Sequence, residues 1–327
     1  MDIVFYNQHQ HGDILLSRQG VRWVIENSPA NVKFHYIHDK SPDSVYVDDA
    51  INHIKFDQKI HCVPMYVVEN SLKSQGVLTN SLWVSTWCGT INGMQMINQM
   101  EDGVLVERYL LPHTSGKYEI GLNEDLILNF KSEAILWKQN IDQINEYFKL
   151  NFCTKEIPYP NEDDLVVRWN GKNKNIELLE KIIDRDKINI LICNGNTFSL
   201  QRNNFQYEDY LKETIINNPN INFYFTEKFH LNYDNVININ DLIPLPNLNE
   251  IEYLSKFCNI IITSLSGPGC AVINSEVVND ENKSLIYICR KRLGLIYDNL
   301  KCKYYQTEDF SKDNIVSILN EAILNQK

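Results

Sequence analysis

The sequence predicts an α/β protein with two domains, each built on a parallel sheet that helices cover on both faces. The chain has 327 residues, which is enough for two domains of ordinary size. Its hydrophobic content of 43% and charged content of 22% are typical of a globular protein. In its second half, short runs that are apolar at nearly every position alternate with helical stretches, which is typical of a parallel sheet buried on both faces.

The first half shows a less regular alternation. A helix at 13–26 is expected because its apolar residues recur on one side with the helical period, and Pro29 follows where it can end the helix. A second amphipathic helix is expected from Lys131 to Leu150 for the same reason. Around these helices we expect strands at 2–6 and 33–37, with further apolar runs at 60–68 and 81–87.

From Ile188 onward the alternation is clear, after a lead-in at 163–187 that carries one short helix. The expected strands are 188–193, 221–226, 235–240, 259–264 and 285–289, and the expected helices are 207–217, 249–257, one from about 270 and one at about 311–325.

The segment "CTKEIPYPNEDD" at 153–164 has two prolines and four acids and is the best candidate for a connection between domains. We therefore expect a first Rossmann-like domain at 1–152, a linker and lead-in at 153–187, and a second Rossmann-like domain at 188–327.

Charge and cysteine usage restrict the class of protein. A formal net charge of −11 argues against nucleic acid as a partner, so any phosphate has to be held locally by a loop or a helix end. The eight cysteines form no CxxC pair, which favours buried reduced thiols and a cytoplasmic location. Neither a leader peptide nor a long apolar run is evident, so we expect no transmembrane segment.

In a doubly wound sheet the ligand binds at the carboxyl ends of the strands, and this geometry selects four loops. The most informative follows the strand at 259–264 and reads "SLSGPG". Its serines can donate hydrogen bonds, its glycines allow a close approach of the backbone, and the next helix offers N–H groups to a phosphate. The alternative is a tight turn without a ligand. The candidate phosphate-binding residues here are Ser264, Ser266, Gly267, Pro268 and Gly269.

Two further loops follow the same logic. The asparagine-rich turn after the strand at 188–193 suits positive φ and is followed by an arginine that can reach a phosphate, although an ordinary polar turn explains it equally. The loop after 221–226 offers a carboxylate for a ribose hydroxyl and an ammonium for a phosphate. The candidate donor-binding residues of these loops are Asn194, Gly195, Asn196, Arg202, Thr226, Glu227 and Lys228.

The fourth loop, "NQHQHGD", leads from the first strand into the first helix. Asp13 is either a helix cap or a general base, and the sequence leaves both open. His9 and His11 would share one face of a strand, but a metal site is not expected because no matching pair elsewhere completes it. The chain also lacks GxGxxG, GxxxxGK[ST] and GxSxG, so dinucleotide, P-loop and serine-hydrolase interpretations lose their usual support.

Two of these loops together resemble the GT-B glycosyltransferases, in particular the bacterial lipopolysaccharide heptosyltransferases and their relatives. The matching motifs are Gly12-Asp13 after the first strand and Ser266-Gly267-Pro268 after "NIIITS". The resemblance implies two Rossmann-like domains that face a central cleft, with Asp13 as catalytic base and the Ser-Gly-Pro loop on the diphosphate. The chain departs from many relatives at Leu265, where they have an acid, and at Cys270, where they have a histidine.

The resemblance further implies an inverting, metal-independent transferase without a cofactor, which moves a sugar from a nucleotide-sugar to a glycan or glycoconjugate. On the acceptor side we expect His9, His11 and Trp87, and Trp83 either stacks on a sugar or lies in the core. Gly12 is expected as a further donor-binding residue that allows a close turn under the sugar. The alternatives are a nucleotide-sugar epimerase or hydrolase on the same scaffold, and a non-catalytic nucleotide- or glycan-binding protein, which Leu265 favours.

Overall fold

The computed structural model describes most of the chain and divides it into two compact units, Met1–Val166 and Val167–Lys327. The boundary lies inside the segment 153–187 expected as linker and lead-in. The described residues are 1–7, 11–38, 50–54, 63, 65–86, 95–101, 104–110, 119–120, 133–168, 175–195, 207–243, 248–264, 266–288 and 300–326.

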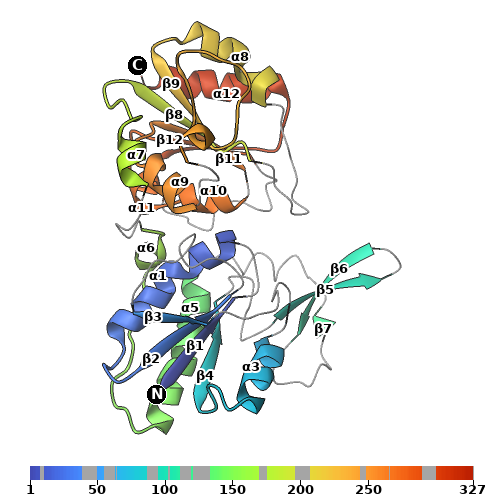
Figure 1. Cartoon of the computed structure of the whole chain (residues 1–327), viewed down its shortest axis with the longest axis vertical. Coiled ribbons are helices and arrows are strands. Elements are labelled where there is room, and N and C mark those ends of the chain that lie inside the picture. The colour runs from blue at the N-terminus through green and yellow to red at the C-terminus, as the bar shows by residue number, and fades with distance from the viewer. Residues whose placement is uncertain are drawn as a thin grey trace. The chain divides into compact units, whose positions relative to one another are not determined.

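Unit 1 is built on a sheet whose strands run in the order β3-β2-β1-β4, and every neighbouring pair is parallel. Figure 1 shows α1 and α5 together on one face of this sheet. On the other face, Val68 and Leu72 of α3 pack with Val4, Tyr6 and Ile37. The bounds are β1 Asp2–Tyr6, β2 Lys33–Ile37, β3 Ile51–Ile54, β4 Ser81–Ser85, α1 His11–Asn27, α3 Met65–Ser74 and α5 Glu133–Leu150.

Helices α1 and α5 approach each other closely at Gly20. A Cβ atom on Gly20 would lie 1.8 Å from Cε2 of Trp137, which is itself fully buried. The Trp137 ring also meets Phe5 of β1 edge-on at 6.4 Å. The glycine in the middle of α1 is therefore required by packing, and it fixes α1 against the sheet.

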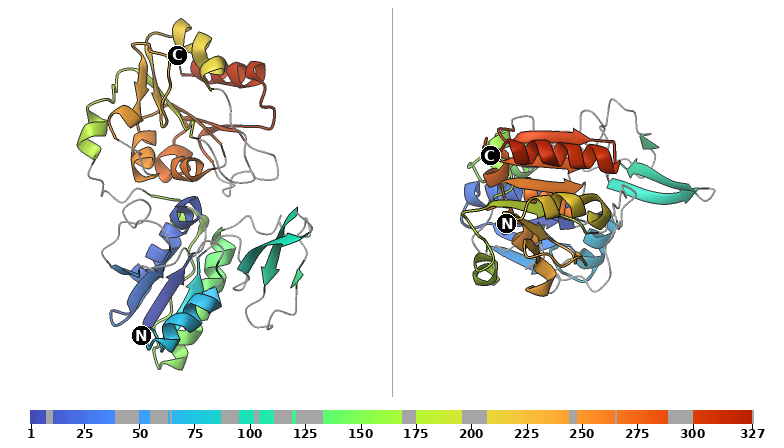
Figure 2. Two further views of the ribbon diagram at one scale, coloured as in Figure 1. Left: turned by 45° about the vertical axis from the view of Figure 1, so that its right-hand side comes forward. Right: turned by 90° about the horizontal axis from the view of Figure 1, so that it is seen from above.

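Unit 1 also contains a second, antiparallel sheet that the sequence did not predict. Its strands β5 Gln95–Glu101, β6 Val104–Leu110 and β7 Glu119–Ile120 pair in that order. Figure 2 shows β5 and β6 as a two-stranded ribbon. This part of the sequence mixes polar and apolar residues without the near-continuous apolar runs that identified the parallel strands.

The proline-rich segment after α5 packs on unit 1. The side chain of Asn145 both donates to the carbonyl of Ile157, at 3.0 Å, and accepts from its N–H, at 2.8 Å. Trp23 Nε1 of α1 donates to the carbonyl of Pro158 at 2.7 Å. The short helix α6 Glu162–Leu165 contacts both α1 and α5. These hydrogen bonds hold the segment that was expected to connect the domains against unit 1.

Unit 2 is built on a six-stranded sheet in the order β10-β9-β8-β11-β12-β13, parallel throughout. One face packs on α8 and α12 through a large apolar cluster, and Figure 1 shows α9 and α10 on the other side. The strands are β8 Ile188–Ile192, β9 Ile221–Phe225, β10 Val236–Asn238, β11 Ile260–Ser264, β12 Ser284–Ile288 and β13 Lys303–Thr307. The helices are α7 Ile176–Glu180, α8 Tyr207–Asn217, α9 Leu248–Ser255, α10 Gly267–Val272, α11 Ser275–Val278 and α12 Lys312–Leu324, with a 3-10 turn η1 at Ile239–Asp241.

The expected strands of unit 2 are confirmed to within two residues, and the expected helix at 207–217 coincides with α8. Strand β13 was missed because only its last residue is buried, and its sequence "KYYQT" is polar at both ends. Within the described part of the chain, none of the helices is long and apolar enough to cross a membrane.

Candidate functional site

The carboxyl edge of the unit 2 sheet brings three of the predicted loops together. Strands β9, β8 and β11 are neighbours in the sheet, so the residues that follow them lie side by side at one edge. Asn194 and Gly195 follow β8, Thr226 to Lys228 follow β9, and Ser266 to Gly269 follow β11. Of the other candidates in unit 2, Asn196 and Arg202 lie outside the described residues, as does Leu265.

Asn194 joins the first two of these loops through its side chain. Its Oδ1 accepts from the N–H of Glu227 at 2.8 Å, and its Nδ2 donates to the carbonyl of Glu227 at 3.1 Å. The hydroxyl of Thr226 donates to the same Oδ1 at 3.3 Å. A side-chain amide that pairs with both backbone groups of one residue fixes the position of that residue, so Asn194 fixes the backbone of Glu227 at the sheet edge.

The carboxylate of Glu227 is oriented by a third segment. Nδ2 of Asn240, in η1, donates to Glu227 Oε2 at 2.9 Å. A Cβ atom on Gly195 would lie 3.4 Å from Glu227 Cγ, an ordinary contact distance, so Gly195 borders this side chain. Lys228 lies 3.9 Å from Asp241 with both side chains more than half exposed, and such a surface pair adds little stability. The result is an exposed carboxylate held in place at the sheet edge.

The "SGPG" segment forms the first turn of α10, about three residues earlier than expected. Ser266 is the N-cap: its Oγ accepts from the N–H of Gly269 at 3.2 Å and donates to the carbonyl of Ser264 at 3.1 Å. Pro268 has no N–H, and the N–H of Cys270 bonds to the carbonyl of Ser266 at 3.0 Å. An anion at this turn can accept a hydrogen bond from the N–H of Gly267, and the positive end of the helix favours its charge.

Gly269 is required where it stands. A Cβ atom there would lie 2.2 Å from the backbone oxygen of Ser264, and a backbone atom cannot swing away as a flexible side chain does. The turn therefore closes directly onto the end of β11, and the helix starts without a loop. Sequence reasoning selected this glycine for close approach to a ligand, and the structure shows that it also packs against the end of the strand.

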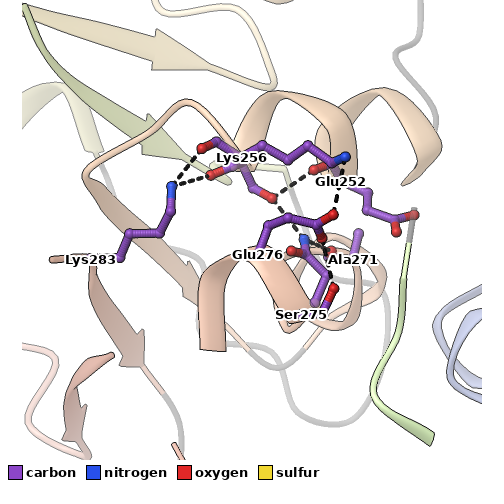
Figure 3. A network of polar contacts seen from close by, with 8 residues as sticks. Glu252, Lys256, Ala271, Ser275, Glu276 and Lys283 are labelled. Atoms are coloured by element: carbon purple, nitrogen blue, oxygen red, sulfur yellow. Dashed lines mark hydrogen bonds and ion pairs between the residues drawn. The ribbon is translucent and has the colours of Figure 1, made fainter. Parts of the chain in front are cut away.

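A buried polar network behind α10 was not anticipated (Figure 3). Lys283, nearly fully buried, donates to the carbonyls of Ser255, Lys256 and Cys258 at 3.2, 2.7 and 2.8 Å. These bonds satisfy the carbonyl of the last residue of α9 and two carbonyls that follow it, while burial lowers the pKa of the Lys283 ammonium. Asn274 ties the two helices together, because its Nδ2 donates to Ser255 Oγ at 2.8 Å and to the carbonyl of Ala271 at 2.9 Å. No sequence pattern around Lys283 or Asn274 indicated that these residues hydrogen-bond to the end of α9.

In unit 1, the structure changes the interpretation of the loop after β1. Helix α1 begins at His11. The expectation that His11 lies on a strand is therefore wrong. Gly12 is a buried residue of the helix, so it does not form the close turn that was expected. Asp13 is the third residue of the helix, where a carboxylate is stabilised by the helix dipole. His9 and Trp87 lie outside the described residues.

Next to the start of α1, a chain of buried hydroxyls crosses the carboxyl edge of the unit 1 sheet. The hydroxyl of Tyr36 lies 2.8 Å from Ser17 Oγ of α1 and 2.8 Å from Thr86 Oγ1, which follows β4. Asn7, which follows β1, donates from Nδ2 to Thr86 Oγ1 at 3.3 Å. Burial raises the pKa of Tyr36 to about 12, and the charge of Asp13 adds to the rise.

Two histidines that the sequence did not single out lie against this chain. His38 follows β2 and His53 belongs to β3, and Nε2 of His38 is 3.3 Å from Nδ1 of His53. Both rings contact Tyr36, with centroids 5.0 Å away for His38 and 6.3 Å away for His53. The pairing of β2 with β3, which the sequence did not predict, is what brings them together.

Among the residues that the structure describes, no group of three or more His, Cys, Asp or Glu side chains is placed to hold a metal ion.

Trp83 was expected either in the core or in a sugar-binding shelf. It is buried in the core with Val4 and Tyr6, and its Nε1 donates to Ser81 Oγ at 2.9 Å. Of its two interpretations, the core residue is confirmed and the sugar-stacking residue is wrong.

No protein-family model and no curated protein sequence matches the chain. Among solved structures it is similar to a family 9 glycosyl transferase from Veillonella parvula, with 10% identity and a TM-score of 0.53 over 99% of this chain and 97% of that one. It is also similar to the heptosyltransferase WaaC of E. coli with ADP, with 10% identity and a TM-score of 0.50 over 98% of this chain and 100% of that one.

At this level of identity the likeness establishes the fold. The chain has the mixed α/β architecture with two parallel-sheet domains that is found in the GT-B glycosyltransferases. The two parallel-sheet α/β domains expected from the sequence are thereby confirmed.

Proposed function

We propose that the chain is a glycosyltransferase that moves a sugar from a nucleotide-sugar to a glycan or glycoconjugate acceptor. The observation that supports this most directly is the match of nearly the whole chain to solved glycosyltransferase structures. The fold alone hosts more than one activity, so the assignment also depends on the chemistry of the two sheet edges.

On this proposal unit 2 binds the donor. Glu227 accepts hydrogen bonds from ribose hydroxyls, and it is suited to this because Asn194 and Asn240 already hold it in place. The diphosphate lies at the first turn of α10, where Gly267 donates its N–H and the helix end favours negative charge. The remaining proposed donor contacts are Gly195, Asn196, Arg202, Thr226, Lys228, Ser264, Ser266, Pro268 and Gly269.

Unit 1 supplies the base. An oxygen of the acceptor attacks the anomeric carbon, the bond from that carbon to the diphosphate oxygen breaks, and Asp13 takes the proton of the attacking hydroxyl. One displacement of this kind inverts the anomeric configuration, and the leaving diphosphate is stabilised by the donors of unit 2 without a metal. His9, His11 and Trp87 are proposed on the acceptor side. Asp13 lies in the first turn of α1, where the helix N-terminus favours a charged carboxylate.

The test is release of nucleoside diphosphate from a panel of nucleotide-sugars, with and without a mixture of glycan acceptors. We expect acceptor-dependent release by the natural protein and a loss of about 10²- to 10⁴-fold in Asp13→Asn, the range for removing a general base. The matched control is Asp2→Asn, at the opposite end of β1, where the carboxylate bonds to His35 at 2.9 Å. Full activity in Asp13→Asn contradicts the base assignment, and release that needs no acceptor indicates a hydrolase.

A further inference from the structure

The hydroxyl of Tyr36 stands out among the buried polar groups of unit 1 that the proposed reaction does not use. The side chain is fully buried, and its ring meets Phe5 edge-on with centroids 6.1 Å apart. A phenylalanine would fill the same space without a polar group, as Phe34 does two positions earlier on β2. Burying a hydroxyl costs free energy unless it is hydrogen-bonded, so its partners indicate what it is for.

The direction of the hydrogen bonds around Tyr36 follows from the number of hydrogens. Ser17 Oγ lies 2.7 Å from the carbonyl oxygen of Ile14, and only the hydroxyl can donate in that contact. Ser17 therefore accepts from the Tyr36 hydroxyl at 2.8 Å. The Tyr36 oxygen in turn accepts from Thr86 Oγ1, also at 2.8 Å. The chain of donors thus runs from Thr86 through Tyr36 and Ser17 to a carbonyl of α1.

One end of this hydroxyl chain is fixed to the sheet. The N–H of Thr86 donates to the carbonyl of Tyr6 at 3.0 Å, and Thr86 Oγ1 accepts from Asn7 Nδ2 at 3.3 Å. The residue before it, Ser85, is held as well, because its carbonyl accepts from Asn140 Nδ2 of α5 at 3.0 Å. The end of β4 is therefore joined to β1 and to α5, which makes it a rigid anchor.

The other end of the chain holds the start of α1. Asp13 and Ser17 are four residues apart in this helix, so they lie on the same face one turn from each other. Because the backbone between them is helical, contacts that fix Ser17 and the Ile14 carbonyl also fix the backbone of Asp13. The charge of Asp13 adds to the rise in the pKa of Tyr36, as expected for a carboxylate on this face.

We propose that Tyr36 positions Asp13 for the reaction, because its hydroxyl holds the second turn of α1 to the carboxyl ends of β2 and β4. This rests on the proposed function. A general base works only within hydrogen-bond reach of the proton it removes, and a displacement of about 1 Å is enough to cost about 10²-fold in rate. Tyr36 is fully buried, so it is a positioning residue and takes no part in the proton transfer.

The first test is Tyr36→Phe, which removes this contact and leaves no donor without an acceptor. Ser17 still donates to the carbonyl of Ile14, and Thr86 can donate to the carbonyl of Tyr6, 3.4 Å away. We expect the melting temperature to fall by only about 2–4 °C, the effect of one hydrogen bond in a protein of this size. We expect kcat to fall by about 10- to 100-fold, with the KM for the nucleotide-sugar unchanged.

The matched control is Tyr6→Phe on the neighbouring strand. It also removes a tyrosine hydroxyl, whose partner is the carbonyl of Val63 at 2.6 Å, on the α3 side of the sheet. We expect kcat of this variant to stay within about twofold of the natural protein. If Tyr36→Phe also keeps kcat within about twofold, or if both variants lose activity equally, the proposal is wrong.

A double variant tests whether Tyr36 acts through Asp13. Once the base is removed in Asp13→Asn, its position no longer matters, so adding Tyr36→Phe should leave kcat unchanged. A residue that only supports the fold would lower kcat by the same factor in both backgrounds. That result would overturn the positioning role.

Amide hydrogen exchange tests the anchor without turnover. The N–H groups of Ser17 and Arg18, whose α-helical partners are the carbonyls of Asp13 and Ile14, should exchange at least about 10-fold faster in Tyr36→Phe. The amides of the unit 2 sheet should exchange at unchanged rates. Equal rates for Ser17 and Arg18 in both proteins overturn the proposal, whatever reaction the chain catalyses. Faster exchange, with no release of nucleoside diphosphate by the natural protein, refutes the proposed function instead.

Discussion

The two sheet edges have the same architecture and different chemistry. In unit 1 the described residues at the edge are ionisable or share hydroxyl protons: Tyr36, His38 and His53 lie within one cluster, and the charge of Asp13 acts on Tyr36. In unit 2 the described residues at the edge include amide and hydroxyl groups with fixed partners, one oriented carboxylate, and a glycine whose Cβ position meets backbone. Parallel strands bring loops together in both cases, and the residues that follow each strand decide what the edge does.

The difference between the two edges shows how one chain can place proton transfer in one unit and anion binding in the other. Moving protons requires groups whose pKa values lie near each other, which is a property of the side chains. Holding a diphosphate requires backbone donors and a close approach of the chain, which is a property of glycine-containing turns. Each edge has the residues for one of these tasks.

The largest effect is expected where the unit 2 edge is broken. In Gly269→Ala the new Cβ meets the Ser264 carbonyl at 2.2 Å, so β11 and α10 have to separate. We expect the free energy of unfolding to fall by about 3 kcal/mol, the upper range for overpacking, and nucleotide binding to be lost. Denaturant titration measures this.

Gly195→Ala is the matched control at the same edge. Its Cβ would lie 3.4 Å from Glu227 Cγ, an ordinary contact, and we expect a change within about 0.5 kcal/mol. If Gly195→Ala and Gly269→Ala lowered the free energy of unfolding equally, the close approach of α10 to β11 would not explain the effect at Gly269.

A smaller effect is expected where unit 1 is disturbed behind its edge. Gly20→Ala places a Cβ 1.8 Å from Trp137, but a side-chain ring can shift where a backbone oxygen cannot. We expect a loss of about 2 kcal/mol in the free energy of unfolding. Combining it with Trp137→Phe should cost less than the sum of the single changes, and strict additivity would contradict the packing explanation.

The smallest effect concerns the proton chemistry of unit 1. The pKa of Tyr36 is raised from 10.0 to about 12 in the folded protein, so the unfolded chain loses this proton first as the pH rises. The stability that Tyr36 contributes is therefore present below pH 10 and decreases as the pH rises toward 12. Between pH 10 and 11 this loss is about 1 kcal/mol, and it should be absent in Tyr36→Phe.

Unfolding curves of the natural protein and of Tyr36→Phe at pH 10 and pH 11 isolate the contribution of Tyr36, because the other tyrosines are common to both. An equal decrease in Tyr36→Phe would mean that the ring is not held neutral by its buried position.

The sequence predicted unit 2 better than unit 1 for a physical reason. "INILIC" and "NIIITS" contain strands that are buried on both faces, so most of their positions are apolar and the strands are visible in the sequence alone. In unit 1, β3 reads "INHI" and its importance lies in its pairing with β2, a long-range contact that no local pattern contains. The His38–His53 pair depends on that register and could not be predicted.

Residue roles were harder to predict than residue positions. A close approach of the backbone was expected at Gly269, but the contact of its Cβ position with Ser264 is visible only in three dimensions. Asn194 was expected as a turn residue and instead holds Glu227 through both of its amide atoms. Asp13 was placed at the helix start, yet α1 begins two residues earlier, because His11 and Gly12 continue the helix toward the sheet edge.

The central claim is that the unit 2 edge binds the nucleoside diphosphate of the donor. A crystal structure of the chain soaked with ADP or UDP tests it most directly. The account predicts phosphate oxygens within hydrogen-bond distance of the Gly267 N–H and ribose hydroxyls on the Glu227 carboxylate. Phosphates bound elsewhere on the chain, with an empty edge after β8, β9 and β11, would contradict it.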